Sequence, residues 1–195
     1  MNLLAIFVAN GAGIFILLIL VYASSARTRR NRIEDRLFAF MIAGVGLACF
    51  MEALSYAIDG HLFFGSRLIN YVANTYLFSV NMLLPFTVLA YVDLALYGDL
   101  ARIWSNYRPQ IAVGLFMFCV NVVNFFVPIS YTISETNVYS RLPFSYVYYF
   151  VILYYCFTSV VVTRRYHRRY GARDFFSIGV FLLPILTGAA LQFAF

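Results

Sequence analysis

The sequence predicts an all-α integral membrane protein, a bundle of six transmembrane helices that forms one domain over residues 1–195. Three observations lead to this prediction: a very apolar composition, six long uncharged runs, and arginines that gather in alternate connections. The chain is 63% hydrophobic and only 11% charged, whereas soluble domains carry about 25% charged residues. A soluble fold this apolar would expose patches that aggregate, so a lipid bilayer is the expected solvent.

The six runs have the length of membrane-spanning helices. A helix that rises about 1.5 Å per residue crosses ~30 Å of hydrocarbon in about 20 residues, and each run offers that length once the second is extended past Glu52 to Ile58. The strands of a membrane barrel alternate in polarity over about ten residues, whereas these runs are continuously apolar. The predicted helices cover residues 2–24, 37–58, 68–97, 109–131, 143–164 and 174–195.

The first run has one alternative interpretation, a cleaved signal peptide. Small residues in "VYASSAR" (Val21–Arg27) would suit signal peptidase. However, the start "MNLLAIF" has no basic residue, and the arginines follow the apolar stretch instead of preceding it, unlike a secretory signal. We therefore expect a retained helix with the N-terminus outside the cell.

The distribution of arginines predicts the orientation of the bundle. All fourteen basic residues are arginines, and twelve of them lie in the first, third and fifth connections. Only Arg67 and Arg141 lie in the second and fourth. Basic residues mark the cytoplasmic side, so the Arg-rich connections are predicted to face the cytoplasm and to contact anionic headgroups. The net charge of +6 then reflects topology, and no nucleic-acid partner is expected.

Polar side chains inside the second and third helices provide the first part of a candidate site. Glu52 lies about 10 Å below the outer end of its helix, where a carboxyl group is costly and usually faces the bundle interior or water. Offsets of four and eleven residues from Asn70 place Asn74 and Asn81 within about 40° of one another on a helix face. The three amides form a stripe that runs inward from the outer surface.

The fourth helix adds Asn121 and Asn124, and two interpretations of all these amides compete. In one they are interhelical glue, worth about 0.6 kcal/mol each on average, and the tyrosines of the fifth helix form an interfacial belt. In the other they converge on an outward-facing pocket for a neutral or cationic small molecule, beneath a loop that acts as a lid. The candidate ligand-binding residues are Glu52, Asn74, Asn81, Asn121, Asn124, Tyr139 and Arg141.

Catalytic and metal-binding patterns are missing from the sequence. It contains no Gly-x-Ser-x-Gly elbow, no His-Glu-x-x-His pair and no Walker loop. Cys49, Cys119 and Cys156 lie in helices without the spacing of a metal site. Asp93 and Arg102 are expected to form a surface ion pair near the inner end of the third helix. The sequence therefore predicts neither enzymatic activity nor a cofactor or metal site in this chain.

Five segments resemble one known pattern in their order and spacing. They are "RIEDRLFAFMI" (Arg32–Ile42), "EALSYAIDG" (Glu52–Gly60), "LLPFTVLAYVDLALYGD" (Leu83–Asp99), "SETNVYSRLPF" (Ser134–Phe144) and "LLPILTGAALQFAF" (Leu182–Phe195). The pattern is similar to the multi-helix membrane sensor regions that precede GGDEF diguanylate cyclase domains in many Gram-positive bacteria. The resemblance covers nearly the whole chain and implies a sensor in the bacterial cytoplasmic membrane that controls cyclic di-GMP synthesis.

Such sensor regions have a seventh helix that returns the chain to the cytoplasm before the cyclase domain. The resemblance therefore implies a truncated seven-helix sensor domain from a longer, homodimeric diguanylate cyclase, with no catalytic residue of its own. Two alternatives remain: a small transporter or channel that uses the polar stripe as a path, and a structural membrane subunit. The polar residues cluster in the outer and middle membrane, which favours a receptor over a channel.

Overall fold

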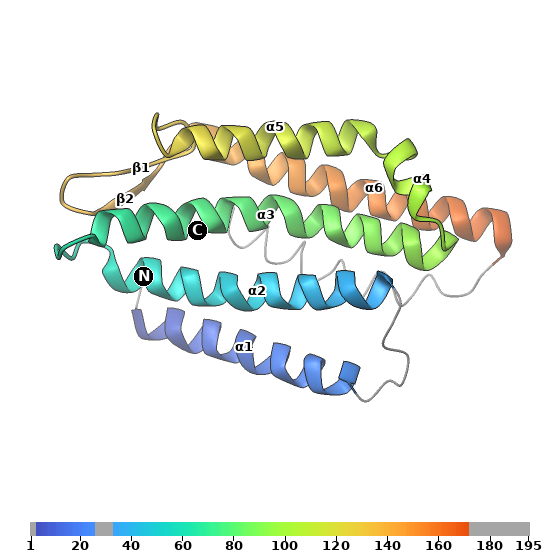
Figure 1. The fold of residues 1–195 in the computed structure, drawn as a ribbon, viewed down its shortest axis with the longest axis horizontal. Coiled ribbons are helices and arrows are strands. Elements are labelled where there is room, and N and C mark those ends of the chain that lie inside the picture. The colour runs from blue at the N-terminus through green and yellow to red at the C-terminus, as the bar shows by residue number, and fades with distance from the viewer. Residues whose placement is uncertain (1–2, 26–32, 172–195) are drawn as a thin grey trace. The chain divides into compact units, whose positions relative to one another are not determined.

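The computed structural model describes residues 3–25 and 33–171, and these residues are mostly helical (Figure 1). The helices are α1 (Leu3–Ser25), α2 (Ile33–Ile58), α3 (Ser66–Tyr97), α4 (Leu100–Asn106), α5 (Arg108–Asn124) and α6 (Tyr146–Tyr170), with strands β1 (Tyr131–Ile133) and β2 (Tyr139–Arg141) and the short 3-10 helix η1 (Pro143–Ser145). The predicted helical class is confirmed at this level. The predicted helix over residues 174–195 and four arginines of the first connection lie outside the described residues.

Three of the described helical segments are long and apolar enough to cross a membrane. They are α2, α3 and the segment Pro143–Tyr170 that η1 and α6 form together. Helix α1 contains a shorter apolar stretch, Ile6–Tyr22, and α5 has 17 residues. These helices indicate a membrane location, while the full bundle of six spans stays a prediction.

The chain divides into two compact units whose boundaries cut through α3 and α5. The first unit consists of Met1–Val80 and Phe118–Ser145, and the second of Asn81–Met117 and Tyr146–Phe195. Each unit therefore contains part of α3 and part of α5.

Helices α1 and α2 pack along each other within the first unit (Figure 1). Glycines allow the close approach: a Cβ atom added to Gly13 would lie 3.3 Å from Sγ of Cys49, and one added to Gly46 would lie 3.6 Å from a Leu17 methyl carbon. Small residues at such contacts are typical of membrane helices, which associate through close van der Waals packing. Many large apolar side chains of α1 are exposed, for example Leu4 and Phe15, as expected for a surface that faces lipid.

Helix α5 ends earlier than its apolar run predicts. The sequence predicts a helix to residue 131, but α5 ends at Asn124, so this predicted boundary is wrong. The physical reason is that the Asn124 side chain binds the backbone that follows, and Pro128 has no backbone N–H with which to continue a helix. The chain then forms an antiparallel hairpin in which Tyr131 pairs with Arg141 and Ile133 pairs with Tyr139.

The core of the second unit joins α6 to α3 and α5. Ile152 and Cys156 of α6 are buried and pack against Val88 of α3. Tyr155 is fully buried, and its hydroxyl donates a hydrogen bond to the backbone oxygen of Gln110 at 2.9 Å. One face of α6 is therefore apolar and aromatic core, and Tyr155 belongs to it.

Candidate functional site

A buried polar cluster joins α2 to α3 in the first unit. The hydroxyl of Ser55 donates to Oδ1 of Asn70 at 2.9 Å. Nδ2 of Asn74 donates to the same Oδ1 at 2.8 Å and to the Ser55 hydroxyl at 2.9 Å. All three side chains are buried, so their hydrogen bonds satisfy polar groups that would otherwise be costly in an apolar interior.

Asn137, in the turn between β1 and β2, connects this cluster to the end of α2. Its Nδ2 donates to the backbone oxygens of Ile58 at 2.7 Å and His61 at 3.0 Å, which are carbonyls at and beyond the helix end. Its Oδ1 accepts from Nδ2 of Asn70 at 3.2 Å. Asn137 has φ of 58°, a left-handed conformation that asparagine tolerates better than most residues. We call Ser55, Asn70, Asn74 and Asn137 the amide cluster.

Asn124 organises the entry to the hairpin. Its Oδ1 accepts from three successive backbone N–H groups, those of Ile129 at 2.7 Å, Ser130 at 2.6 Å and Tyr131 at 3.2 Å. Its Nδ2 donates to the backbone oxygen of Tyr131 at 3.2 Å. The side chain is 1% exposed. Both Oδ1 and Nδ2 of Asn124 are therefore engaged by the backbone of this loop, and the side chain has a structural role in holding it.

Asn121 and Tyr131 bind the middle of α3. Nδ2 of Asn121 donates to the backbone oxygen of Thr75 at 2.7 Å and to the hydroxyl of Ser79 at 2.6 Å. The Tyr131 ring stacks on Phe78, with ring centroids 5.2 Å apart. Burial, partly offset by hydrogen bonds, raises the pKa of Tyr131 to about 12, so its phenol stays protonated at neutral pH.

The structure brings only part of the predicted ligand-binding set together. Asn74, Asn121 and Asn124 are buried in the first unit, where they bind helices and loop. Their neighbour on β2, Tyr139, donates its backbone N–H to Oδ1 of Asp59 at 2.8 Å, which fixes the hairpin to the α2–α3 connection. Hydrogen bonds therefore attach this loop to the helices at several points. These bonds would have to break for the loop to act as the predicted lid.

The other three predicted residues are not among the side chains of the hydrogen bonds described above. Glu52 is half-buried on α2, three residues before Ser55, and among residues 3–25 and 33–171 no hydrogen bond or ion pair to its carboxylate is found. Arg141 is exposed at the end of β2. Asn81 belongs to the second unit. A binding role for any of them stays a prediction.

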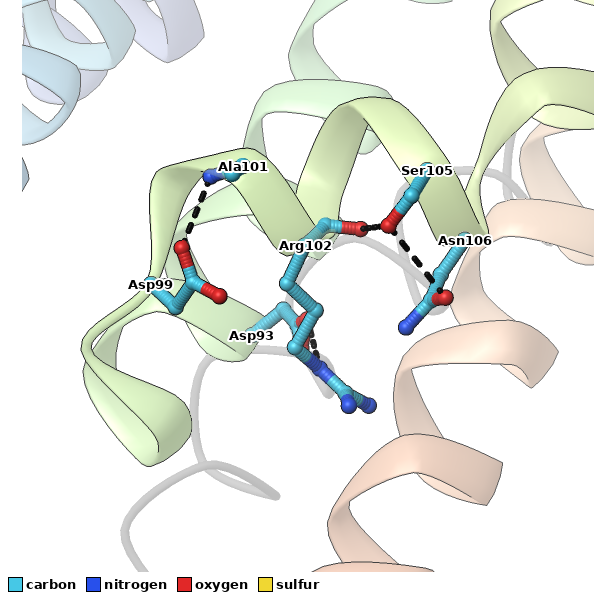
Figure 2. Close-up of polar contacts among 6 residues, drawn as sticks. All are labelled: Asp93, Asp99, Ala101, Arg102, Ser105 and Asn106. Atoms are coloured by element: carbon cyan, nitrogen blue, oxygen red, sulfur yellow. Dashed lines mark hydrogen bonds and ion pairs between the residues drawn. The ribbon is translucent and has the colours of Figure 1, made fainter.

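A buried ion pair lies at the other end of α3, in the second unit (Figure 2). Nε of Arg102, on α4, donates to both carboxylate oxygens of Asp93, at 2.8 and 3.0 Å. Asp93 is 0% exposed, so the prediction of a surface ion pair is right about the partners and wrong about the environment. The reason is the short helix α4, which reverses the chain and carries Arg102 back over Asp93.

Aromatic rings surround this ion pair. The Arg102 guanidinium lies over the ring of Tyr97, 3.7 Å from its centroid, a cation–π contact. Burial lowers the pKa of Arg102, but the hydrogen bond and the charge of Asp93 outweigh this and raise it overall. Burial, followed by the negative charge of Asp93, raises the pKa of Tyr107 well above its usual range. Arg102 therefore remains a cation, and Tyr107 remains neutral, at any physiological pH.

A cavity of about 480 Å³ opens beside the ion pair in the second unit. Its polar lining consists of Arg102, Asn106, Tyr107, Gln110, Thr158 and Arg165. The remaining lining is aromatic and aliphatic and comes mainly from α6. None of the seven residues predicted to bind a ligand lines it.

Sequence reasoning missed the residues of this cavity for an identifiable reason. From the sequence, Arg165 is explained by topology, and Arg102 by topology together with an ion pair to Asp93. Gln110 follows directly after Pro109 at the start of a helix, where a polar residue is unremarkable. A usable signal was present: Tyr154, Thr158 and Arg165 recur at helical spacing on one face of α6.

Comparison with known proteins adds no relative. No protein-family model, no curated protein and no solved structure matches the chain. In the described part of the chain, no group of three or more His, Cys, Asp or Glu side chains is arranged to hold a metal ion. The structure shows a mostly helical protein, and three segments long and apolar enough to cross a membrane suggest a membrane location. Its function has to be argued from geometry.

Proposed function

We propose that the chain is a membrane-embedded sensor module whose outward-facing hairpin and amide cluster form the sensing element. In this proposal the module controls a cytoplasmic diguanylate cyclase domain, as the resemblance to sensor regions suggests. The observation that carries the proposal is a continuous chain of hydrogen bonds. It runs from Asn137 in the loop through Asn70 to Ser55 and Asn74 within α2 and α3.

Such a chain of bonds suits a two-state element. Each link joins neutral groups, and a neutral hydrogen bond contributes about 1 kcal/mol net in proteins and about 0.6 kcal/mol between membrane helices. Bonds of this strength can exchange partners at low net cost. A ligand that replaced a bond of Asn137 would release the end of α2 from the loop and shift the packing of α2 against α3. It would do so only if it bound the two arrangements unequally.

The contacts also limit where the ligand binds. Asn70, Asn74 and Asn124 already bond to protein groups, so a ligand that reached them would have to displace those bonds. We therefore place the ligand at the hairpin, with Glu52 as the deeper group that favours a neutral or cationic molecule. Buried and mutually bonded amides also make a poor water-filled path, which supports a receptor over the transporter or channel alternative.

The experiment must distinguish a role of the amide cluster in sensing from a role only in holding the helices together. Membranes that contain the full-length gene product are assayed for cyclic di-GMP formation from GTP, with activity normalised to the amount of folded protein. The variant Asn137→Ala removes the link between loop and helices, and Thr136→Ala is its matched control because the Thr136 hydroxyl bonds only to exposed Ser134 among described residues.

We expect Asn137→Ala to change the normalised rate of cyclic di-GMP formation about five-fold or more. This corresponds to a change of about 1 kcal/mol in the free-energy difference between the two arrangements. Thr136→Ala should leave the rate unchanged. Equal specific output in both variants, with only the yield of Asn137→Ala reduced, would assign the cluster to structural glue. A gene product that makes no cyclic di-GMP would remove the cyclase from the proposal.

A further inference from the structure

We propose that the cavity of the second unit binds an anionic phospholipid, with the lipid phosphate between Arg102 and Arg165 and an acyl chain along Phe157 and Val161. This inference does not depend on the sensor function or on the nature of any output domain. It rests on the shape of the cavity, on the order of residues along α6, on the two arginines at one end and on a buried acceptor without a partner among the described residues.

The cavity is amphipathic along a single helix face. Tyr154, Phe157, Thr158, Val161 and Arg165 line it, at offsets of three, four, seven and eleven residues, which recur on one side of an α-helix. Since a helix rises about 1.5 Å per residue, the stripe extends over about 16 Å from Tyr154 to Arg165. It begins aromatic and aliphatic and ends in a cation. A ligand that matches this order has an apolar tail and an anionic head.

The cationic end of the cavity has donors that Asp93 does not engage. In the described part of the chain, the hydrogen bonds of the Arg102 side chain to Asp93 both use Nε, and Figure 2 shows the two terminal nitrogens of its guanidinium directed away from the Asp93 carboxylate. Arg165 is exposed and forms no ion pair within residues 33–171. Asp93 neutralises one of the two arginines, so the cavity keeps about one net positive charge, which matches a phosphodiester.

Gln110 supplies the second, independent observation. Gln110 lines the cavity and is 9% exposed, yet its side-chain Oε1 is buried without a hydrogen-bond partner in the described part of the chain. An unpaired buried acceptor costs about 1–3 kcal/mol, so a donor from a ligand would relieve it. A headgroup that carries a hydroxyl beside its phosphate, as phosphatidylglycerol does, offers both the acceptor for the arginines and the donor for Gln110.

The predicted topology places this site where such lipids are found. Arg102, Arg165 and their arginine neighbours belong to the connections predicted to face the cytoplasm. Basic pockets between helices on that side bind anionic headgroups. Trp104, the single tryptophan, is exposed on α4, and tryptophan is enriched at the headgroup level of membranes.

The test measures the melting temperature of the purified chain in an uncharged detergent. Three additions are titrated: phosphatidylglycerol, phosphatidylcholine with the same acyl chains, and inorganic phosphate. The variants are Arg165→Gln, which lines the cavity, and Arg164→Gln, which removes the same charge from an adjacent exposed position outside it. Gln110→Met is included because it removes the unpaired acceptor without leaving any partner unsatisfied.

We expect phosphatidylglycerol to raise the melting temperature at lower concentrations than phosphatidylcholine. Arg165→Gln should need about five-fold more phosphatidylglycerol for the same shift, the effect of losing one arginine near a phosphate, and Arg164→Gln should behave like the original chain. Gln110→Met should melt no lower than the original chain without lipid and should respond less to phosphatidylglycerol. Equal responses of Arg165→Gln and Arg164→Gln would overturn the site in favour of general charge attraction. A full shift by inorganic phosphate alone would overturn the lipid as its ligand.

Discussion

Replacing Asn124 by leucine should destabilise the protein far more than the same replacement at Asn121, one helical turn earlier. Both asparagines are buried on α5, and leucine matches their shape in each case. The sequence gives no reason to separate them. The structure does, because their hydrogen bonds have different partners.

The difference follows from what each substitution leaves behind. Asn124→Leu removes the acceptor of three backbone N–H groups, of which those of Ile129 and Ser130 are bound at 2.7 and 2.6 Å. A buried donor left unsatisfied costs about 1–3 kcal/mol, so two of them give a loss of about 3 kcal/mol. Asn121→Leu leaves no buried donor without an acceptor. Nδ2 of Asn121 donates to the Thr75 backbone oxygen and to the Ser79 hydroxyl, and that hydroxyl still donates to the Thr75 backbone oxygen in the variant. It also removes a buried acceptor, Oδ1, that has no partner within the described residues.

We therefore expect a loss of about 3 kcal/mol for Asn124→Leu and of less than about 1 kcal/mol for Asn121→Leu. For a chain of this length, 1 kcal/mol corresponds to a shift of about 2–4 °C in melting temperature. Asn124→Leu should melt about 6–12 °C lower than the original chain, measured by thermal unfolding in one detergent. Equal shifts for the two variants would refute the reasoning, because they would mean that the backbone donors of the loop are satisfied in another way.

Two further predictions concern the ion pair and a buried phenol. Arg102→Gln should lower the free energy of unfolding by about 3 kcal/mol, and more than Asp93→Asn, because it leaves a charge uncompensated at a position that is 0% exposed while Arg102 is 32% exposed; thermal unfolding of the two variants in the same detergent should show this order. Between pH 10 and pH 12 the free energy of unfolding should fall as pH rises, because the unfolded Tyr131 phenol ionises near 10 and the folded one keeps its proton until about 12. Tyr131→Phe should reduce that slope, and a slope identical to that of the original chain would contradict the role of Tyr131.

The sequence predicts the long helices well where the hydrophobic pattern and the chain breaks coincide. Helix α3 was predicted over residues 68–97 and is observed as Ser66–Tyr97, ending at Gly98 with φ of 68°. The end of α5 could not be predicted in the same way. Residues 125–129 are apolar and continue the run, and the interaction that stops the helix is a side chain binding a backbone six residues further on. Hydrophobicity carries no information about such a bond.

The candidate site shows the same division. Both interpretations of the amides, as contacts between helices or as a pocket, direct Asn74, Asn121 and Asn124 toward the protein interior, and the structure has them buried. Their partners could not be inferred, since Ser55 is an ordinary residue in an apolar helix and Asn137 an ordinary one in a polar loop. Ser55 gains its role from the contact of α2 with α3, and Asn137 from the contact of the hairpin with the end of α2. A polar residue in an apolar helix thus predicts that the side chain is buried, but not which groups it binds.

The buried ion pair is a different case, because a short stretch of sequence contains everything needed to form it. Gly98 takes the left-handed conformation that ends α3 and donates to the backbone oxygen of Leu94 at 2.8 Å. Asp99 then caps α4 by accepting from the N–H of Ala101 at 2.9 Å. The first turn of α4 consequently points back along α3 and sets Arg102 over Asp93, nine residues earlier. A buried carboxylate in a membrane helix needs a cation, and here the turn that supplies it also shapes one wall of the cavity, so loss of the Gly98 turn should remove the ion pair and the lipid site together.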